Sequence, residues 1–313
     1  MHNTAPFKLT TSPALLQTLN IHPPLNKTEN DIRSWIIYGE NRLVDKIQVL
    51  VHQHQLMLMN AWMMGPYQVI RISGNLTKKL RDEVEEAGLD CADVSHIPTL
   101  QQPGLIVLDM DSTSIQIECI DQIAALAGVG DEVAQVTERA MRGELDFEHS
   151  LRARVGKLAN ADVSILAQVR NSLPLMPELK EMVKTLEVYN WKVAIASGGF
   201  TYFSDYLQEK LGLVYAKSNV LGIENGKLTG QVIGPVVDAQ EKAKVLLSLA
   251  QELDMNANNT LAVGDGANDL PMIHAAHFGV AYHAKPKVIE QAPAAIVNAY
   301  LGGVLCILSA SLI

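Results

Sequence analysis

Three short polar loops in this 313-residue chain carry side chains suited to chemistry. The first loop, residues 109–113, reads DMDST and follows the apolar run 105–108. Its carboxylates, Asp109 and Asp111, lie at positions i and i+2 of an expected strand end, so they point to the same side of the chain. That arrangement suits a nucleophile and an acid or base that share one reaction centre. A capping aspartate followed by a turn aspartate is the structural alternative.

The second loop, residues 197–199, reads SGG and follows the apolar run 193–196. We expect a helix from Phe200 onward, which places Ser197, Gly198 and Gly199 at a helix N-terminus. A serine hydroxyl and glycine amides can bind a phosphate there, because the unpaired N–H groups and the helix dipole both favour an anion. An ordinary serine cap is the alternative.

The third loop, residues 264–269, reads GDGAND and follows the apolar run 260–263. Asp265, Asn268 and Asp269 offer the oxygen ligands that Mg²⁺ prefers in proteins. A calcium loop is one alternative, although the further acidic ligands expected after Asp269 are missing. A turn rich in Asp and Asn is the other.

The elements that must position these loops predict an α/β fold. Strand patterns over 105–108, 192–196, 260–263 and 278–281 alternate with helical patterns, which is typical of a parallel sheet with crossover helices. The first three strands each run into one of the polar loops, and the carboxyl ends of parallel strands share one edge of a sheet. We therefore expect the loops to converge.

The segment between the first two of these strands is far longer than one crossover helix requires. Helical patterns over 131–141, 147–158 and 163–170 predict a small helical cap, inserted over about residues 120–180. The apolar segment 301–313 is too short to span a bilayer and predicts a buried terminal helix.

Residues 1–98 contain no chemical motif and predict an accessory α/β domain, ahead of a second domain over 104–313. Strand patterns cover 34–38 and 67–72, and residues 75–87 form a helical pattern closed by a glycine. His52 and His54 alternate on a further possible strand, and no third ligand accompanies them.

Composition excludes several classes of function. A net charge of −9 and a pI near 5.5 argue against binding to nucleic acids or membrane surfaces. Cys91, Cys119 and Cys306 are odd in number and lack metal-ligand spacing, which favours a reducing cytoplasm over a disulfide framework or a zinc site. The oligomeric state stays open, and a homodimer is one alternative.

Taken together, the three loops and a lysine between the second and third resemble the motif set of the haloacid dehalogenase (HAD) superfamily, over residues 105 to about 297. Within it the chain is most similar to the phosphoserine phosphatases. The residues that carry this resemblance are 109–113 with Glu118, the run MRG at 141–143 with Phe147, the run SLR at 150–152 with Arg154, and 197–200 and 263–269. The resemblance implies a HAD-like Rossmannoid parallel sheet with a helical-bundle cap insertion and a small N-terminal α/β domain.

The resemblance also implies the roles of the loop residues. Asp109 would attack phosphorus to give an aspartyl phosphate, and Asp111 would act as general acid and then as base. Lys242 corresponds to the family's lysine, with Lys244 as its neighbouring competitor. Mg²⁺ would be bound by Asp109, Asp265 and the backbone carbonyl of Asp111.

The implied substrate is the small molecule O-phosphoserine, hydrolysed in the final step of serine biosynthesis. Its ammonium and carboxylate would be recognised by Glu118 and Arg154, and Met141 and Phe147 would shield the site from water. The phosphate-binding residues would be Ser197, Gly198 and Asn268, and the supporting residues Thr113, Gly199 and Asp269.

Two other functions compete with this interpretation. One is a related HAD phosphatase or phosphotransferase that acts on another small phosphomonoester. The other is a non-catalytic amino-acid sensor, in which the front domain binds an effector. In a milder form of that hypothesis, residues 1–98 resemble regulatory modules of the ACT type.

Overall fold

The computed structural model describes residues 5–21, 33–40 and 43–313, and residues 1–4, 22–32 and 41–42 of the predicted accessory domain lie outside these ranges. Spatial contacts divide the chain into two compact units. The first comprises Met1–Ile106, Pro177–Lys192 and Ala250–Ile313, and the second comprises Val107–Met176 and Val193–Leu249. The predicted boundary between 1–98 and 104–313 divides the chain once along its sequence, whereas each of these units is made of separate segments. The predicted boundary stays a prediction.

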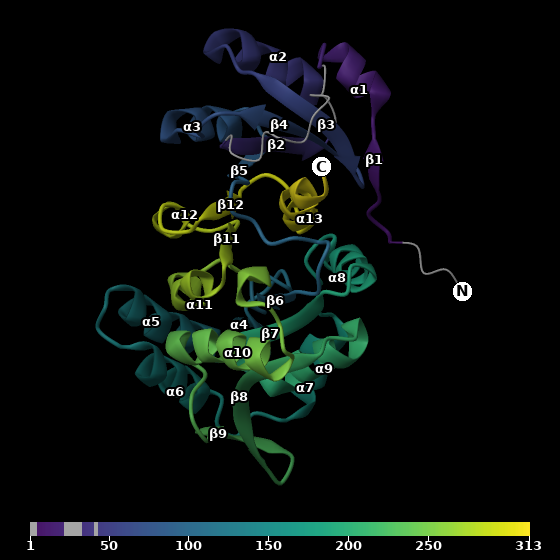
Figure 1. The fold of residues 1–313 in the computed structure, drawn as a ribbon. Coiled ribbons are helices and arrows are strands. Elements are labelled where there is room, and N and C mark those ends of the chain that lie inside the picture. The colour runs from purple at the N-terminus through teal and green to yellow at the C-terminus, as the bar shows by residue number, and fades with distance from the viewer. Residues whose placement is uncertain (1–4, 22–32, 41–42) are drawn as a thin grey trace. The chain divides into compact units, whose positions relative to one another are not determined.

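The first unit contains a five-stranded antiparallel sheet in the order β1-β3-β4-β2-β5 (Figure 1). The strands are β1 (Leu9–Thr11), β2 (Ser34–Glu40), β3 (Leu58–Met64), β4 (Tyr67–Ser73) and β5 (Asp90–Asp93), and the helices beside them are α1 (Pro13–Thr18), α2 (Leu43–His54) and α3 (Lys78–Glu86). The two strands and the helix predicted here are confirmed, with small differences at their ends.

The strand expected around His52 and His54 is wrong, because both histidines lie in the last turn of α2. Ile47 and Leu50 of that helix are buried three residues apart, which is the spacing of one helix face. His54 Nε2 lies 2.5 Å from Glu83 Oε2 of α3. The alternation of the two histidines suggests a strand, but the spacing of the buried residues Ile47 and Leu50 is that of a helix.

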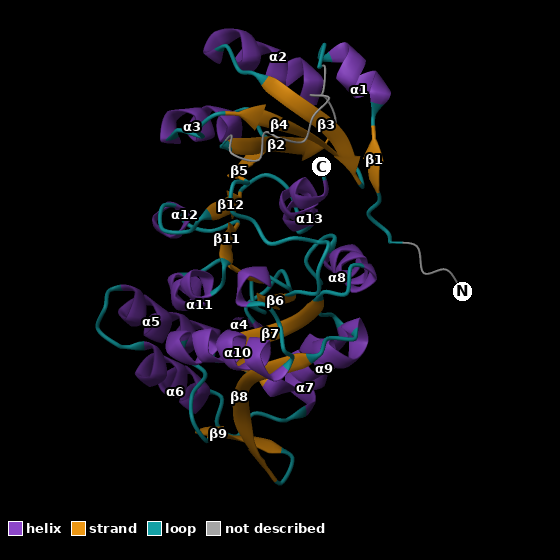
Figure 2. Ribbon diagram, viewed as in Figure 1, coloured by secondary structure: helices purple, strands orange, loops and turns teal. Residues whose placement is uncertain are grey.

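Both faces of this sheet are covered, which explains the uninterrupted apolar run in β2. Trp35 and Ile37 pack in one core with residues of α1, α2 and α3. Tyr38 points to the opposite face, where its ring approaches Gly303 of α13 (Gly302–Ser309). Ile36, between Trp35 and Ile37 in the strand, is fully buried. Figure 2 shows α13 on the side of the sheet away from α1 and α2. Every residue of α13 is buried, so the predicted terminal helix is confirmed.

The second sheet has the strand order β12-β11-β10-β6-β7-β8-β9. Its strands are β6 (Leu105–Leu108), β7 (Lys192–Phe200), β8 (Tyr215–Glu224), β9 (Lys227–Ile233), β10 (Thr260–Gly264), β11 (Phe278–Tyr282) and β12 (Ala294–Ile296). The pairs β7–β8, β10–β11 and β11–β12 are parallel, and β8–β9 is an antiparallel hairpin. All four predicted strands are confirmed. The strand order changes direction at β6, and such a switch point is where ligands bind in parallel sheets.

The predicted helical segment between β6 and β7 is present in the second unit, as α4 (Cys119–Leu126), α5 (Gly130–Met141), α6 (Phe147–Lys157) and α7 (Ser164–Asn171). The remaining helices are α8 (Leu179–Val188), α9 (Thr201–Leu211), α10 (Ala239–Glu252), α11 (Leu270–Ala275), α12 (Pro286–Ile289) and three 3₁₀ turns at Ala257–Asn259, Ala267–Asp269 and Ala310–Leu312. In the described part of the chain, no helix combines the length and the apolar character needed to cross a membrane.

The β8–β9 hairpin turns at Asn225 and Gly226, whose φ angles are 51° and 75°. Positive φ at both central residues is the reason for an Asn-Gly pair in this type of turn. Arg152 of α6 donates to the carbonyl of Val232 in β9 at 3.0 Å, which joins the hairpin to the cap.

Candidate active site

The first loop begins where β6 ends. All four side chains of β6 are fully buried, so the chain first presents a polar group at Asp109. Lys242 Nζ of α10 lies 2.8 Å from Asp109 Oδ1, and the two side chains are only 1% and 7% exposed. Lys244 is 71% exposed and pairs with Glu241 instead. Of the two candidate lysines, Lys242 is therefore the one in contact with Asp109.

The second carboxylate of this loop, Asp111, has a strongly perturbed pKa. Burial raises the pKa of Asp111 to about 7, and the negative charge of Glu118 adds to the rise. Hydrogen bonds from the thiol and the backbone N–H of Cys119 and the charge of Lys242 oppose it. A carboxyl group with this pKa is about half protonated at neutral pH, so both the acid form and the base form are available.

The second loop packs against the first through its glycines. A Cβ atom on Gly199 would stand 2.5 Å from Met110 Cε and 3.0 Å from Asp111 Oδ2, so a side chain does not fit there. Ser197 is buried, and its Oγ accepts a hydrogen bond from the Gly199 N–H at 2.9 Å. A Cβ on Gly198 would lie 2.7 Å from the Phe147 ring. The loop therefore lies beside Asp111 and Phe147.

Sequence reasoning missed Asn219, a buried residue of β8 that positions this loop. Its Nδ2 donates to the Gly198 carbonyl at 2.8 Å, and its Oδ1 accepts from the Val237 N–H at 2.8 Å. Val237 lies just before α10, so one amide links the glycine loop to the helix that carries Lys242. An asparagine inside a strand is unusual, and that departure was the available signal.

The predicted cap residues differ in how far they are exposed to solvent. Glu118 is exposed and accepts a hydrogen bond from Ser112 Oγ at 2.7 Å. Burial lowers the pKa of Arg154, while the carboxylates of Asp121, Glu118 and Asp111 oppose that change. Met141 ends α5 with 71% of its surface exposed, and its role in shielding the site stays a prediction.

The third loop folds tightly because of its two glycines. A Cβ on Gly264 would stand 2.4 Å from Asp269 Cγ, and a Cβ on Gly266 would stand 2.2 Å from Asn268 Oδ1. Asp269 is fully buried, and its Oδ2 accepts from the Gly266 N–H at 3.0 Å. Asp265 keeps part of its surface exposed.

An acidic group able to hold a metal ion is present among the described residues. Asp109, Asp265 and Asp269 each offer one carboxylate oxygen, and these atoms lie within 4.8 Å of one another. A set of carboxylate oxygens suits a hard cation such as Mg²⁺. Thr113 is fully buried behind the first loop.

Comparison with known proteins identifies the family. Residues 103–277 match the model of haloacid dehalogenase-like hydrolases, and residues 33–93 match a domain of unknown function, DUF5609. A phosphoserine phosphatase of Vibrio cholerae is 58% identical over 283 residues, covering 90% of this chain and 86% of that protein.

Solved structures agree with this assignment. An unliganded crystal structure of a probable phosphoserine phosphatase from Vibrio cholerae has a TM-score of 0.89 and 54% identity, covering 98% of this chain and 95% of that one. A structure of a phospho-aspartyl intermediate analogue of phosphoserine phosphatase has a TM-score of 0.62 and 39% identity, covering 65% of this chain and 98% of that one. The chain therefore belongs to the haloacid dehalogenase-like hydrolases and, within them, to the phosphoserine phosphatases.

Proposed function

We propose that this protein hydrolyses O-phosphoserine to serine and phosphate through an aspartyl phosphate on Asp109, as the final step of serine biosynthesis. The observation that carries the proposal is the buried pair of Asp109 and Lys242, beside an Asp111 whose pKa is raised to about 7. The similarity to phosphoserine phosphatases along most of the chain supports the choice of substrate.

The two carboxylates of the first loop have different roles in the reaction. Lys242 places a positive charge 2.8 Å from Asp109, and a carboxylate oxygen of Asp109 attacks phosphorus as the bond to the serine oxygen breaks. Asp111, in its acid form, gives its proton to the departing serine oxygen. In the second step Asp111 is a carboxylate and takes a proton from the water that attacks the aspartyl phosphate, which returns both residues to their starting states.

The other loops bind the phosphoryl group. We assign its oxygens to Ser197, Gly198 and Asn268, and the positioning of the loops to Thr113, Gly199 and Asp269. Mg²⁺ would be held by Asp109, Asp265 and the backbone carbonyl of Asp111, and when bound it offsets the negative charge of the phosphoryl oxygens. The acidic group of Asp109, Asp265 and Asp269 supports this choice of ion.

Arg154→Ala tests the substrate. We expect this variant to raise KM for O-phosphoserine at least about tenfold, because a charged hydrogen bond to the substrate carboxylate is lost. O-phosphoethanolamine keeps the ammonium and lacks the carboxylate, so its KM should stay within about twofold of the unmodified enzyme's value. Phosphate release from both esters measures this split. Equal effects on the two would favour another small phosphomonoester as the natural substrate.

Lys242→Ala and Lys244→Ala form a matched pair. Removing the buried Lys242 leaves Asp109 without its 2.8 Å partner, and we expect kcat to fall at least about a hundredfold. Lys244 is largely exposed, and its removal should change kcat less than about twofold. Similar losses in both variants would assign the effect to α10 as a whole.

We also propose that the protein works in the cytoplasm, where its free thiols stay reduced. The burial of Cys91, Cys119 and Cys306 without disulfides supports this. A homodimer and a regulatory role for residues 1–98 stay proposals that sedimentation and effector titrations would test.

A further inference from the structure

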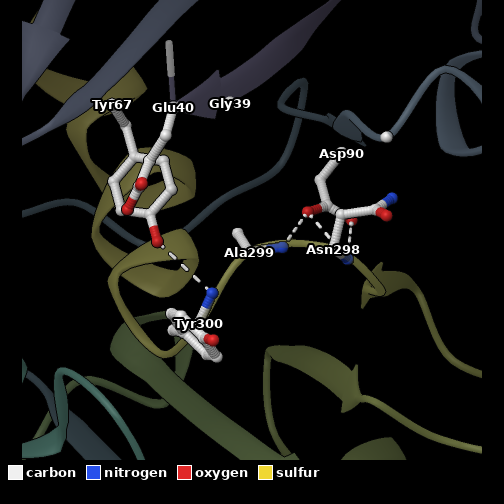
Figure 3. Close-up of a pocket in the computed structure, with 8 residues that line it drawn as sticks. Gly39, Glu40, Tyr67, Asp90, Asn298, Ala299 and Tyr300 are labelled. Atoms are coloured by element: carbon white, nitrogen blue, oxygen red, sulfur yellow. Dashed lines mark hydrogen bonds between the residues drawn. The ribbon is translucent and has the colours of Figure 1, made fainter.

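A cavity of about 170 Å³ lies within the first unit, and its lining residues are not among those assigned to catalysis. Its lining comes from the end of β2, the start of β4, the turn before β5 and the segment after β12; the lining residues are Gly39, Glu40, Tyr67, Gly88, Asp90, Asn298, Ala299 and Tyr300. Figure 3 shows Glu40 and Tyr67 together on one side and Asp90 with Asn298 on the other. Glu40 and Tyr67 are cross-strand partners in the sheet.

Hydrogen-bond donors in this lining are already engaged. Asp90 accepts from the backbone N–H groups of Asn298 and Ala299, and the Tyr300 N–H donates to the Tyr67 hydroxyl at 3.3 Å. That hydroxyl donates in turn to Glu178 Oε2 at 2.8 Å. The Asn298 side-chain amide donates to two backbone carbonyls. An anionic ligand would find none of these donors free.

Glu40 differs from the lining residues that already make hydrogen bonds. Among the described residues, its carboxylate makes no hydrogen bond or ion pair, and the side chain is exposed to solvent. The carboxylates of Asp90 and Glu178 add negative charge around the cavity. A cation of the described chain borders the lining, since Lys46 Nζ would stand 3.2 Å from a Cβ on Gly88. Within the part of the chain that the structure describes, the unpaired charge at the cavity is therefore that of Glu40.

Three titratable groups, Tyr67 in the lining and Tyr282 and Glu178 outside it, have pKa values raised first by burial and further by negative charge. Burial raises the pKa of Tyr67 and of Tyr282, and the charge of Glu178 raises both further. The pKa of Glu178 is itself raised, by burial first and then by the charge of Glu40, against hydrogen bonds that lower it. A field of this sign attracts a cation and repels an anion.

We infer that this cavity binds a small organic cation, whose ammonium group pairs with the Glu40 carboxylate and which also contacts the exposed ring of Tyr300. A carboxylate supplies a charge-assisted hydrogen bond, and tyrosine faces attract cations through their ring electrons. An engineered cavity of about 150 Å³ holds benzene, so a ligand of up to roughly six to eight non-hydrogen atoms fits here, and ethylammonium is within this limit. The inference does not depend on the proposed phosphatase activity.

The test uses the full-length protein and ethylammonium chloride as the probe, with sodium chloride and sodium acetate as reference salts. We expect saturable changes in the amide NMR signals of Gly39, Gly88 and Ala299 with ethylammonium alone. Glu40→Gln should raise the apparent Kd about tenfold, since it removes the charge and keeps the shape. Glu209→Gln, at an exposed position of α9, is the matched control and should leave the Kd unchanged.

Two results would overturn the inference. One is the same signal changes with sodium chloride as with ethylammonium, which would mean general salt effects. The other is an unchanged Kd in the Glu40→Gln variant, which would place the ligand elsewhere. Phosphate release from O-phosphoserine should be normal in both variants, so a failure here is separate from a failure of the proposed function.

Discussion

Asp109→Asn is expected to lower kcat for O-phosphoserine at least about a thousandfold, which is the scale seen when a catalytic nucleophile is removed. A carboxamide has the shape of the carboxylate but lacks the charge that attacks phosphorus. The expected result has two parts. Phosphate release should be lost, and acid quenching of the reaction should trap no phosphoenzyme from the variant although it traps one from the unmodified protein.

A loss of activity could also come from unfolding, because the variant removes the negative charge that lies 2.8 Å from the buried Lys242 Nζ. Removing one member of a buried ion pair costs about 3–5 kcal/mol, whereas replacing both members costs much less. The double variant Asp109→Asn/Lys242→Met should therefore recover thermal stability and stay inactive. A double variant that recovers activity, or a single variant with more than about a tenth of the normal kcat, would remove Asp109 from the mechanism.

Deletion of residues 1–98 is expected to give an aggregated protein instead of an independent enzyme. The deletion uncovers one side of α13, where Trp62 Nε1 donates to Ser309 Oγ at 2.9 Å and Tyr38 packs on Gly303. Each large apolar side chain that loses its cover costs about 1.5–3 kcal/mol, and a whole domain is stable by only about 5–15 kcal/mol. Size-exclusion chromatography and thermal unfolding measure the outcome.

A milder variant tests the same junction in a folded protein. Asp90 accepts hydrogen bonds from three successive N–H groups, those of Val297, Asn298 and Ala299, at 2.6–3.1 Å. Asp90→Ala leaves these donors without their acceptor and should lower the free energy of unfolding by about 2–4 kcal/mol. A monodisperse truncated protein with the melting temperature of the full chain would contradict the prediction. It would support a detachable regulatory module instead.

The sequence was sufficient for the parts of the fold in which local pattern and position agree. The apolar runs 105–108 and 260–263 are each followed directly by a loop with charged residues. The residue types alone therefore predicted the two strands and the edge of the sheet at which their loops lie. Residue type alone could not decide between Lys242 and Lys244. Both lie on one helix, and only the resemblance to a family favoured the residue that the structure places against Asp109.

Contacts between distant parts of the chain could not be predicted. Trp62 and Ser309 are 247 positions apart, and Asp90 and Val297 are 207 apart, so no local pattern links them. The role of Asn219 likewise depends on two backbone groups that meet it only in the folded chain. The helix that ends at Met141 was predicted with the correct end, so the exposure of Met141 depends on packing that no local pattern shows.

The contact between Tyr38 and Gly303 has an evolutionary consequence. A Cβ on Gly303 would stand 3.2 Å from Tyr38 Cε2 and 3.1 Å from Ile296 Cδ1, so even alanine requires its neighbours to move. Across species, a larger residue at position 303 should occur together with a smaller one at position 38. Mutations near the two ends of the coding sequence would then be inherited as compensating pairs, although a long stretch of the gene separates them.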